Sequence, residues 1–289
     1  MVRPPIGLSR PRPGLVWITL STFSPDDADR AAYQRLFREL DSTERWIPST
    51  RAIVIDLEKN HGGSSSWSED VADRLWGKAA VDDALAHYFR HTQIWWLADS
   101  ANIAYFQESA VHARAEDRVE DADDMSRVAV QLAAAKERGE RFYVEDFGAL
   151  LAAKAGRAKP RALPPVYIVT DGDCVSACLD AVDLFTRFPG VKLVGAPTSA
   201  DSNYLEVRLE PLPSGRGAVW LPTKIWVNRP RRAGQVYEPE IPVNDLEWTQ
   251  EKLLDHMERD LSVSSPSMRN SRHSHSASQK RSDDQRPGS

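Results

Sequence analysis

The sequence predicts an α/β protein, in which short buried strands alternate with amphipathic helices. Residues 53–55 form a continuous apolar run, which is typical of a strand buried on both faces. A second such run, at 166–169, leads through a short polar turn into apolar residues at helical spacing over 177–185. These two strand signals and one helix signal define the fold class.

The first elements follow from local signals. A strand is expected over 14–23, where Val16, Ile18 and Leu20 alternate with their neighbours. A helix should begin at Ser24-Pro25, because a capping serine, a proline at the first helical position and acids in the first turn are all helix-start signals. After the strand at 53–55, a polar glycine-containing turn over 56–66 leads to a helix over 67–75.

The region of about 78–160 has the composition of a helical insert of two or three helices with one solvated, ion-paired face. His87 and His91 are four residues apart and could face one metal ion. The zinc-protease pattern, however, requires glutamate directly after the first histidine, and Tyr88 stands there. No metal site is therefore expected. The aromatic residues Trp95 and Trp96 belong either to the core or to a cap over a substrate cleft.

The remaining chain predicts a strand over 191–198, a hairpin with its turn at 214–217, and a last helix over 248–261. The basic cluster 229–232 could receive a carboxylate, although a solvated loop is the usual role of such a cluster. Residues 1–13 are expected to be a disordered leader, and the apolar-poor segment 262–289 a disordered tail. One domain over 14–261 remains.

Composition excludes several classes of protein. A chain of 289 residues with 41% hydrophobic and 27% charged residues is that of an ordinary soluble domain, and a net charge of -5 gives no reason to expect nucleic acid as a partner. No signal peptide or membrane span is evident, so the chain as written is expected to be cytoplasmic, or exported if an N-terminal signal segment is missing from it.

Cysteine content is equally restrictive. Cys174 and Cys178 are too few for a four-ligand metal site or a disulfide framework. The helical spacing places Cys178 on the buried face, and Cys174 should be the more exposed thiol.

Ser176 stands at the junction between the 166–169 strand and the helix that follows. The first N–H groups of a helix have no internal partners and lie at the positive end of its dipole, so they can stabilise an anion. A serine hydroxyl there can attack a carbonyl whose oxygen becomes negative within reach of those donors. The alternative is that Ser176 merely caps the helix.

Gly62 and Gly63 form the second notable feature. Paired glycines let the backbone approach a ligand closely and can point an N–H into a cleft. The alternative is a loop that simply requires positive φ.

Several segments, in this order, resemble the C-terminal processing (tail-specific) serine peptidases. The strand GLVWITLSTFS precedes IVIDLEKNHGG, which is similar to the family's strand and turn ending in Asp-Leu-Arg-x-Asn-x-Gly-Gly. VYIVTDGDCVSACLDAV followed by VKLVGAPTSA is similar to the nucleophile segment, and QVYEPEIPVND to the closing segment. Together they span most of 14–246 outside the helical insert. The resemblance implies a ββα-spiral core of the crotonase/Clp-protease type.

The resemblance implies a serine peptidase that hydrolyses peptide bonds through an acyl-enzyme on Ser176, without metal or cofactor. The N–H of Ala177 and an N–H of the Gly62-Gly63 pair would be the oxyanion donors. The substrate would be a peptide or protein, and the oligomeric state stays open. His61 is the one histidine beside the oxyanion-type turn and so a candidate base, or else an exposed loop residue.

The resemblance fails at the base. The family's lysine should follow the Val-Gly-x-Pro-Thr strand, and Asp201 stands in its place, where it cannot act as a neutral lysine. A catalytically inactive peptide-binding relative is therefore a second reading, and ester or thioester hydrolysis a third. All three functional interpretations depend on Ser176 and the twin-glycine bend sharing one pocket.

Overall fold

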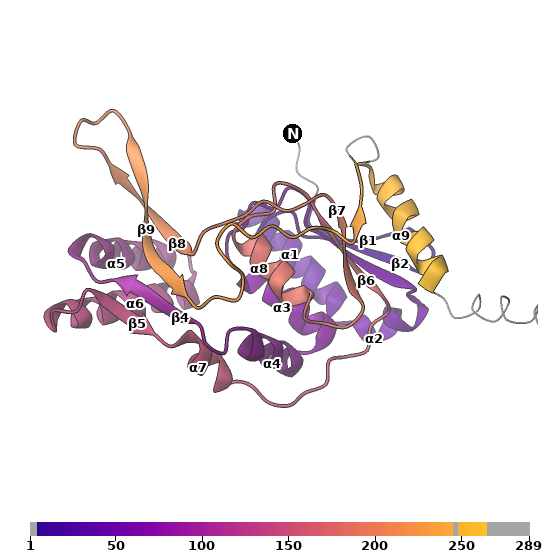
Figure 1. Ribbon diagram of the computed structural model, residues 1–289, viewed down its shortest axis with the longest axis horizontal. Coiled ribbons are helices and arrows are strands. Elements are labelled where there is room, and N and C mark those ends of the chain that lie inside the picture. The colour runs from indigo at the N-terminus through magenta and orange to yellow at the C-terminus, as the bar shows by residue number, and fades with distance from the viewer. Residues whose placement is uncertain (1–4, 245–247, 265–289) are drawn as a thin grey trace, which may run out of the picture.

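A mixed six-stranded sheet forms the centre of the computed structural model, which describes residues 5–244 and 248–264 (Figure 1). Its order is β1-β2-β3-β6-β7-β10. All neighbours pair in parallel except β1, which pairs antiparallel with β2. The strands are β1 (Gly7–Arg12), β2 (Leu15–Thr19), β3 (Ala52–Asp56), β6 (Val166–Thr170), β7 (Val191–Gly195) and β10 (Ile241–Pro242). β2, β3 and β6 are buried along their whole length. The continuous apolar runs at 53–55 and 166–169 predict this for β3 and β6, whereas the alternation expected over 14–23 does not predict it for β2.

Helices cover both faces of this sheet. One face packs against α1 (Asp27–Leu40), α3 (Ser66–Trp76) and α8 (Ala177–Phe185) in the largest hydrophobic cluster. The other face is covered by α9 (Gln250–Ser264), which inserts Leu253, Leu254 and Met257. Shorter elements are α2 (Thr43–Trp46) and η1 (Ile47–Ser49).

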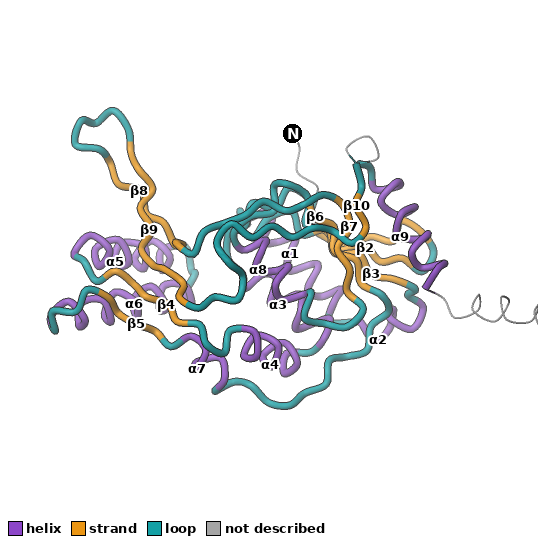
Figure 2. The backbone as a smooth tube through the Cα atoms, in the orientation of Figure 1, coloured by secondary structure: helices purple, strands orange, loops and turns teal. Residues whose placement is uncertain are grey.

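A second, four-stranded antiparallel sheet has the order β5-β4-β9-β8. Its strands are β4 (Gln93–Leu97), β5 (Phe142–Glu145), β8 (Tyr204–Pro211) and β9 (Ala218–Val227). The helices α5 (Ser100–Ala115) and α6 (Val119–Glu137) pack on it through Trp96, Phe106 and Leu132. α4 (Lys78–Tyr88) and α7 (Phe147–Ala152) lie between the two parts, and the β8–β9 hairpin projects away from the body (Figure 2).

The α/β class is confirmed, but three boundary predictions are wrong. The disordered leader contains β1, whose partner β2 follows it directly. The helical insert contains β4 and β5, because β4 pairs with β9 more than a hundred residues away and no local window shows that partner. The helix after Ser24 is capped by Asp26, whose carboxylate accepts the N–H of Asp29. The tail prediction falls largely on residues 265–289, outside the described residues, while α9 runs on to Ser264.

No described helix is both long and apolar enough to cross a bilayer. Within the described ranges, no group of three or more histidine, cysteine, aspartate or glutamate side chains is arranged to hold a metal ion.

Candidate active site

The loops that follow β3 and β6 lie side by side, because these strands are adjacent and parallel. Lys59 links the two loops: its N–H donates to the Asp171 carboxylate at 3.1 Å, and its Nζ lies 2.8 Å from Asp173 Oδ2. The hydrogen bond from Lys59 lowers the pKa of Asp173. The twin-glycine bend and the serine turn therefore share one end of the sheet.

Ser176 has an unusual backbone conformation at this junction. It occupies the N-cap position of α8 with φ 59° and ψ −125°, and its side chain makes no capping hydrogen bond. For a residue with a Cβ, this positive φ costs on the order of 1–3 kcal/mol, and such strain concentrates at functional sites. The side chain is partly exposed. A sharp, strained strand-to-helix turn that exposes a serine is also how α/β-hydrolases present their nucleophile.

Gly62 packs directly against the serine turn. A Cβ at Gly62 would lie 2.8 Å from Ser176 Cβ and 2.9 Å from the Ala177 nitrogen, distances that real Cβ atoms do not tolerate. Its φ of +90° is also in the region that favours glycine. The glycine is thus required by close approach as well as by conformation, and the twin-glycine bend and the serine turn are in contact.

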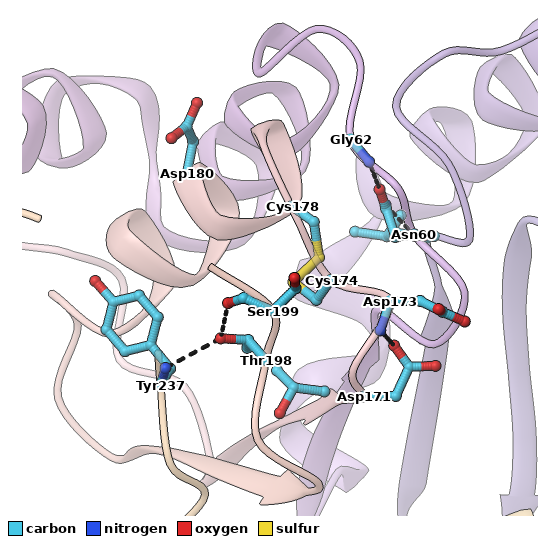
Figure 3. Close-up of a disulfide and its surroundings, with 12 residues drawn as sticks. Asn60, Gly62, Asp171, Asp173, Cys174, Cys178, Asp180, Thr198, Ser199 and Tyr237 are labelled. Atoms are coloured by element: carbon cyan, nitrogen blue, oxygen red, sulfur yellow. Dashed lines mark hydrogen bonds between the residues drawn. A yellow bond between two sulfur atoms is a disulfide. The ribbon is translucent and has the colours of Figure 1, made fainter. Parts of the chain in front are cut away.

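The backbone donors at this contact are not equivalent. The N–H of Gly62 donates to Asn60 Oδ1 at 2.8 Å, and the Asn60 amide in turn donates to the Leu20 carbonyl (Figure 3). The N–H groups of Gly63 and Ala177 have no hydrogen-bond partner among the described residues. Gly63 and Ala177 therefore offer the open donors, whereas Gly62 supplies the space.

His61 is exposed on the same bend, one residue before Gly62. Its charge contributes to the lowered pKa of Asp173, after the larger effect of Lys59. Among the described residues no hydrogen bond joins His61 to Ser176, so its role as base stays a prediction.

The two cysteines form a disulfide that spans the serine turn (Figure 3). Cys174 and Cys178 are both fully buried, so the prediction of an exposed Cys174 thiol is wrong. The α8 helix begins between them, and the N–H of Ser199 donates to the Cys174 carbonyl at 3.1 Å. The bond therefore joins the turn before Ser176 to the first turn of α8.

A buried charge cluster holds the other side of α8. Arg231, whose side chain is fully buried, pairs with Asp180 at 2.6 Å and Asp183 at 2.9 Å on α8, and with Asp201 on the loop after β7. Arg229 also pairs with Asp180. The prediction of a solvated basic loop is wrong for these two arginines, because the carboxylates they meet belong to the same chain.

Two tyrosines complete this cluster. The hydroxyls of Tyr88 and Tyr237 both donate to Asp183 Oδ1. Burial raises the pKa of Asp183, and Arg231 opposes that rise. Tyr237 also exchanges backbone and side-chain hydrogen bonds with Thr198, so the loop after β7 is fixed to the same cluster (Figure 3).

Sequence reasoning missed this cluster, although a signal existed. Asp180 and Asp183 are the only charged residues on α8, where every other residue is apolar. Because a buried carboxylate requires a partner, such a helix predicts two cationic groups elsewhere in the chain. The cluster 229–232 was the obvious candidate. Asp201, which stands where the tail-specific peptidases that the sequence resembles have their lysine, forms an ion pair with Arg231 in the same cluster.

An open cleft of about 740 Å³ adjoins the twin-glycine bend. The turn between α5 and α6, with the start of α6, forms one wall. The segment after β2, α1, the twin-glycine loop and α3 form the other. Its lining mixes apolar and charged side chains: Phe23, Ser24, Pro25, Arg30, Gly63, Ser64, Trp67, Glu116, Asp117, Arg118, Val119 and Asp121. A peptide lying in this cleft would pass Gly63.

Comparisons with known proteins show only distant similarity. No model of a protein family and no curated protein matches the chain. Solved structures match over most of the chain: a protein of Parabacteroides merdae described as a peptidase (13% identity, TM-score 0.46, 91% of this chain and 65% of that one) and mature CPAF complexed with lactacystin (12%, 0.49, 86% and 51%).

The photosystem II D1 C-terminal processing protease matches as well, at 14% identity and TM-score 0.37, over 84% of this chain and 46% of that one. The chain thus spans between about half and two thirds of the length of these proteins. At these identities no activity transfers from one protein to another, so the function has to be inferred from the site.

Proposed function

We propose that the protein is a serine peptidase in which Ser176 attacks the peptide carbonyl. The observation that supports this most strongly is the strained, partly exposed Ser176, which makes no capping hydrogen bond and packs against Gly62. The next residue, Gly63, lines the open cleft. As the Ser176 oxygen bonds to the carbonyl carbon, its hydroxyl proton passes to a general base and the carbonyl oxygen becomes an anion; the base then gives that proton to the amine. The N–H groups of Ala177 and Gly63 would stabilise that anion. The amine leaves with a proton, and water then hydrolyses the acyl-enzyme.

A fluorophosphonate probe tests the nucleophile, because it phosphonylates an activated serine. We expect the native chain to be labelled and Ser176→Ala to lose the label, while Ser126→Ala, on the distant α6, keeps it. Labelling that persists in Ser176→Ala would contradict the assignment.

We propose His61 as the base, because it adjoins Gly62, which packs against Ser176 across the two loops. A general base contributes about 10²–10⁴-fold to rate, so His61→Gln should slow labelling by at least about 100-fold without altering the melting temperature. His87→Gln, which removes an exposed histidine on α4, is the control. An unchanged rate in His61→Gln would exclude this base.

A second candidate, an inactive peptide-binding protein, is favoured by Asp201. That residue is held by Arg231, and no described side chain hydrogen-bonds to Ser176. This reading expects no labelling of the native chain, together with peptide binding that Ser176→Ala leaves unchanged. Turnover of a peptide library by the purified chain would eliminate it, and turnover of chromogenic esters alone would favour the esterase reading.

Two finer proposals accompany the first. The core follows the ββα spiral of the crotonase type, supported by the parallel order β2-β3-β6-β7 with α1, α3 and α8 packed together on one face. The protein also functions in an oxidising compartment, since disulfides are rare in reducing ones. Counting free thiols in protein taken from its native compartment tests the proposal of an oxidising compartment. Two free thiols per chain would contradict that proposal.

A further inference from the structure

The β8–β9 hairpin projects from the second sheet as an arm with little cover (Figure 1). Every residue from 211 to 222 is exposed. β8 is the last strand in the order β5-β4-β9-β8, so its outer edge is unpaired within the described chain. An unpaired edge presents free N–H and C=O groups to another strand.

One face of the arm is apolar. Leu209 is opposite Trp220, and Val207 is opposite Pro222, so these pairs share a face. Val207, Leu209 and Trp220 are 44%, 52% and 66% exposed. Soluble proteins rarely leave such a row of large apolar side chains in water unless it contacts a partner.

The two prolines show which backbone groups of the edge are open. Proline cannot donate to a ladder, so the nitrogens of Pro211 and Pro222 must point away from the β8–β9 pairing. The N–H of Leu212 donates to the Gly217 carbonyl at 2.8 Å, which places residue 212 in the set that faces β9. Because the backbone alternates along a strand, Val207, Leu209 and Pro211 direct their backbone groups to the open side.

The edge sequence Val-Arg-Leu-Glu-Pro at 207–211 is complementary to itself when it is turned around Leu209. An antiparallel copy places Leu209 opposite Leu209, Arg208 opposite Glu210, and Val207 opposite Pro211. The apolar residues then meet apolar residues and each charge meets its opposite, which is the arrangement that stabilises cross-strand pairs. The left-handed residue Glu206 lies just outside this segment.

We propose that β8 pairs with β8 of a second copy of this chain, about a two-fold axis through Leu209. Leu209 exchanges reciprocal backbone hydrogen bonds with its counterpart, and each Val207 N–H donates to the Pro211 carbonyl opposite. The missing N–H of Pro211 is tolerated because only its carbonyl is used. The joined sheet aligns Trp220, Leu209 and their counterparts in one apolar row.

A second copy fits better than an unrelated extended peptide. An isologous contact needs only one surface, which must be complementary to itself, and the 207–211 segment meets that condition in both charge and apolarity. Arg208 has donors to spare: it bonds Asn102 of α5 and Glu210 within its own chain, and a guanidinium carries five N–H groups. Glu210 is 45% exposed and can reach the other copy.

Charge reversal tests the pairing by sedimentation equilibrium of the full chain. Arg208→Glu places a glutamate of each copy opposite Glu210 of the other copy. Glu210→Arg places an arginine of each copy opposite Arg208 of the other copy. Each variant alone should dimerise about 30-fold more weakly than the native chain. An equimolar mixture of the two should dimerise like the native chain, because every cross-strand pair is again of opposite charge.

The mixture isolates the intermolecular contact, since mixing cannot repair a misfolded chain or a lost bond to Asn102. Trp220→Ser should also weaken the dimer, whereas Val263→Ser, an exposed apolar position on α9, should not. A native chain that stays monomeric at about 100 μM, or a mixture no stronger than its components, would overturn the proposal. A monomer that instead binds extended peptides at β8 would assign the edge to a peptide. None of these results depends on Ser176.

Discussion

At the scale of single residues, the site depends on the absence of a side chain at Gly62. Ser176 stays in its strained conformation because the loops around it leave no alternative, and Gly62 lets the second loop come within contact distance. The serine hydroxyl makes no capping hydrogen bond to α8, and Gly62 lies against the Ser176 Cβ. The same close approach explains why a glycine, and not another small residue, is needed.

Gly62→Ala should therefore displace the serine turn. The added Cβ would meet the Ser176 Cβ and the Ala177 nitrogen, and the positive φ adds strain. We expect the free energy of unfolding to fall by about 2 kcal/mol or more and fluorophosphonate labelling to be lost.

Gly77→Ala is the matched control, since its φ of +95° is nearly the same but its Cβ would meet nothing within 4 Å. Urea denaturation measures both variants. Equal losses of stability would show that conformation alone, and not the contact with Ser176, requires Gly62.

At the scale of elements, α8 is fixed from two sides. The Cys174–Cys178 disulfide ties its first turn to the preceding turn, and Arg231 ties Asp180 and Asp183 to the segment that follows β9. The helix that carries Ser176 thus cannot shift without breaking a covalent bond or a buried charge network.

Arg231→Met should be strongly destabilising. It leaves three carboxylates in the interior without their common partner, and breaking a buried pair typically costs about 3–5 kcal/mol. Chemical denaturation measures the loss. Arg232→Met, at the exposed neighbour, should cost less than about 0.5 kcal/mol. A loss below about 1 kcal/mol for Arg231→Met would contradict the network.

At the scale of the whole molecule, stability should depend on the protonation of Asp56. This residue ends β3, is 4% exposed and accepts hydrogen bonds from the Trp17 indole and the Glu58 N–H. Burial raises the pKa of Asp56 to about 7. Between about pH 4 and pH 7 the native state therefore retains a proton that the unfolded chain has released, and stability falls as the pH rises.

Asp56→Asn should remove this dependence, because the amide stays neutral. A shift of about three pH units corresponds to about 4 kcal/mol, so the native chain should lose about that much stability relative to the variant between pH 4 and pH 8. Burial also raises the pKa of Glu69 to about 7, but that effect is present in both proteins and cancels. Parallel stability curves for the two proteins would contradict the prediction.

The strands and helices that local sequence determines were predictable. Continuous apolar runs gave β3 and β6, helical spacing gave α8, and the paired glycines marked the bend, since each of these depends on neighbours in sequence. β4 was not predictable in this way, because its partner β9 lies outside the windows in which periodicity is visible. β1 was missed for another reason: its sequence GLSRPR is mostly polar and half of it is exposed, so it carries no apolar pattern.

The sequence by itself determined the α/β class, the strand-to-helix junction at Ser176 and the need for glycine near residue 62. Only the tertiary structure decided that Gly62 touches Ser176, that its N–H is taken by Asn60, and that Arg231 gathers three aspartates. The physical reason is that periodicity and turn signals report interactions between neighbours along the chain. A contact between two loops, or the partner of a buried charge, is settled by which strands lie side by side.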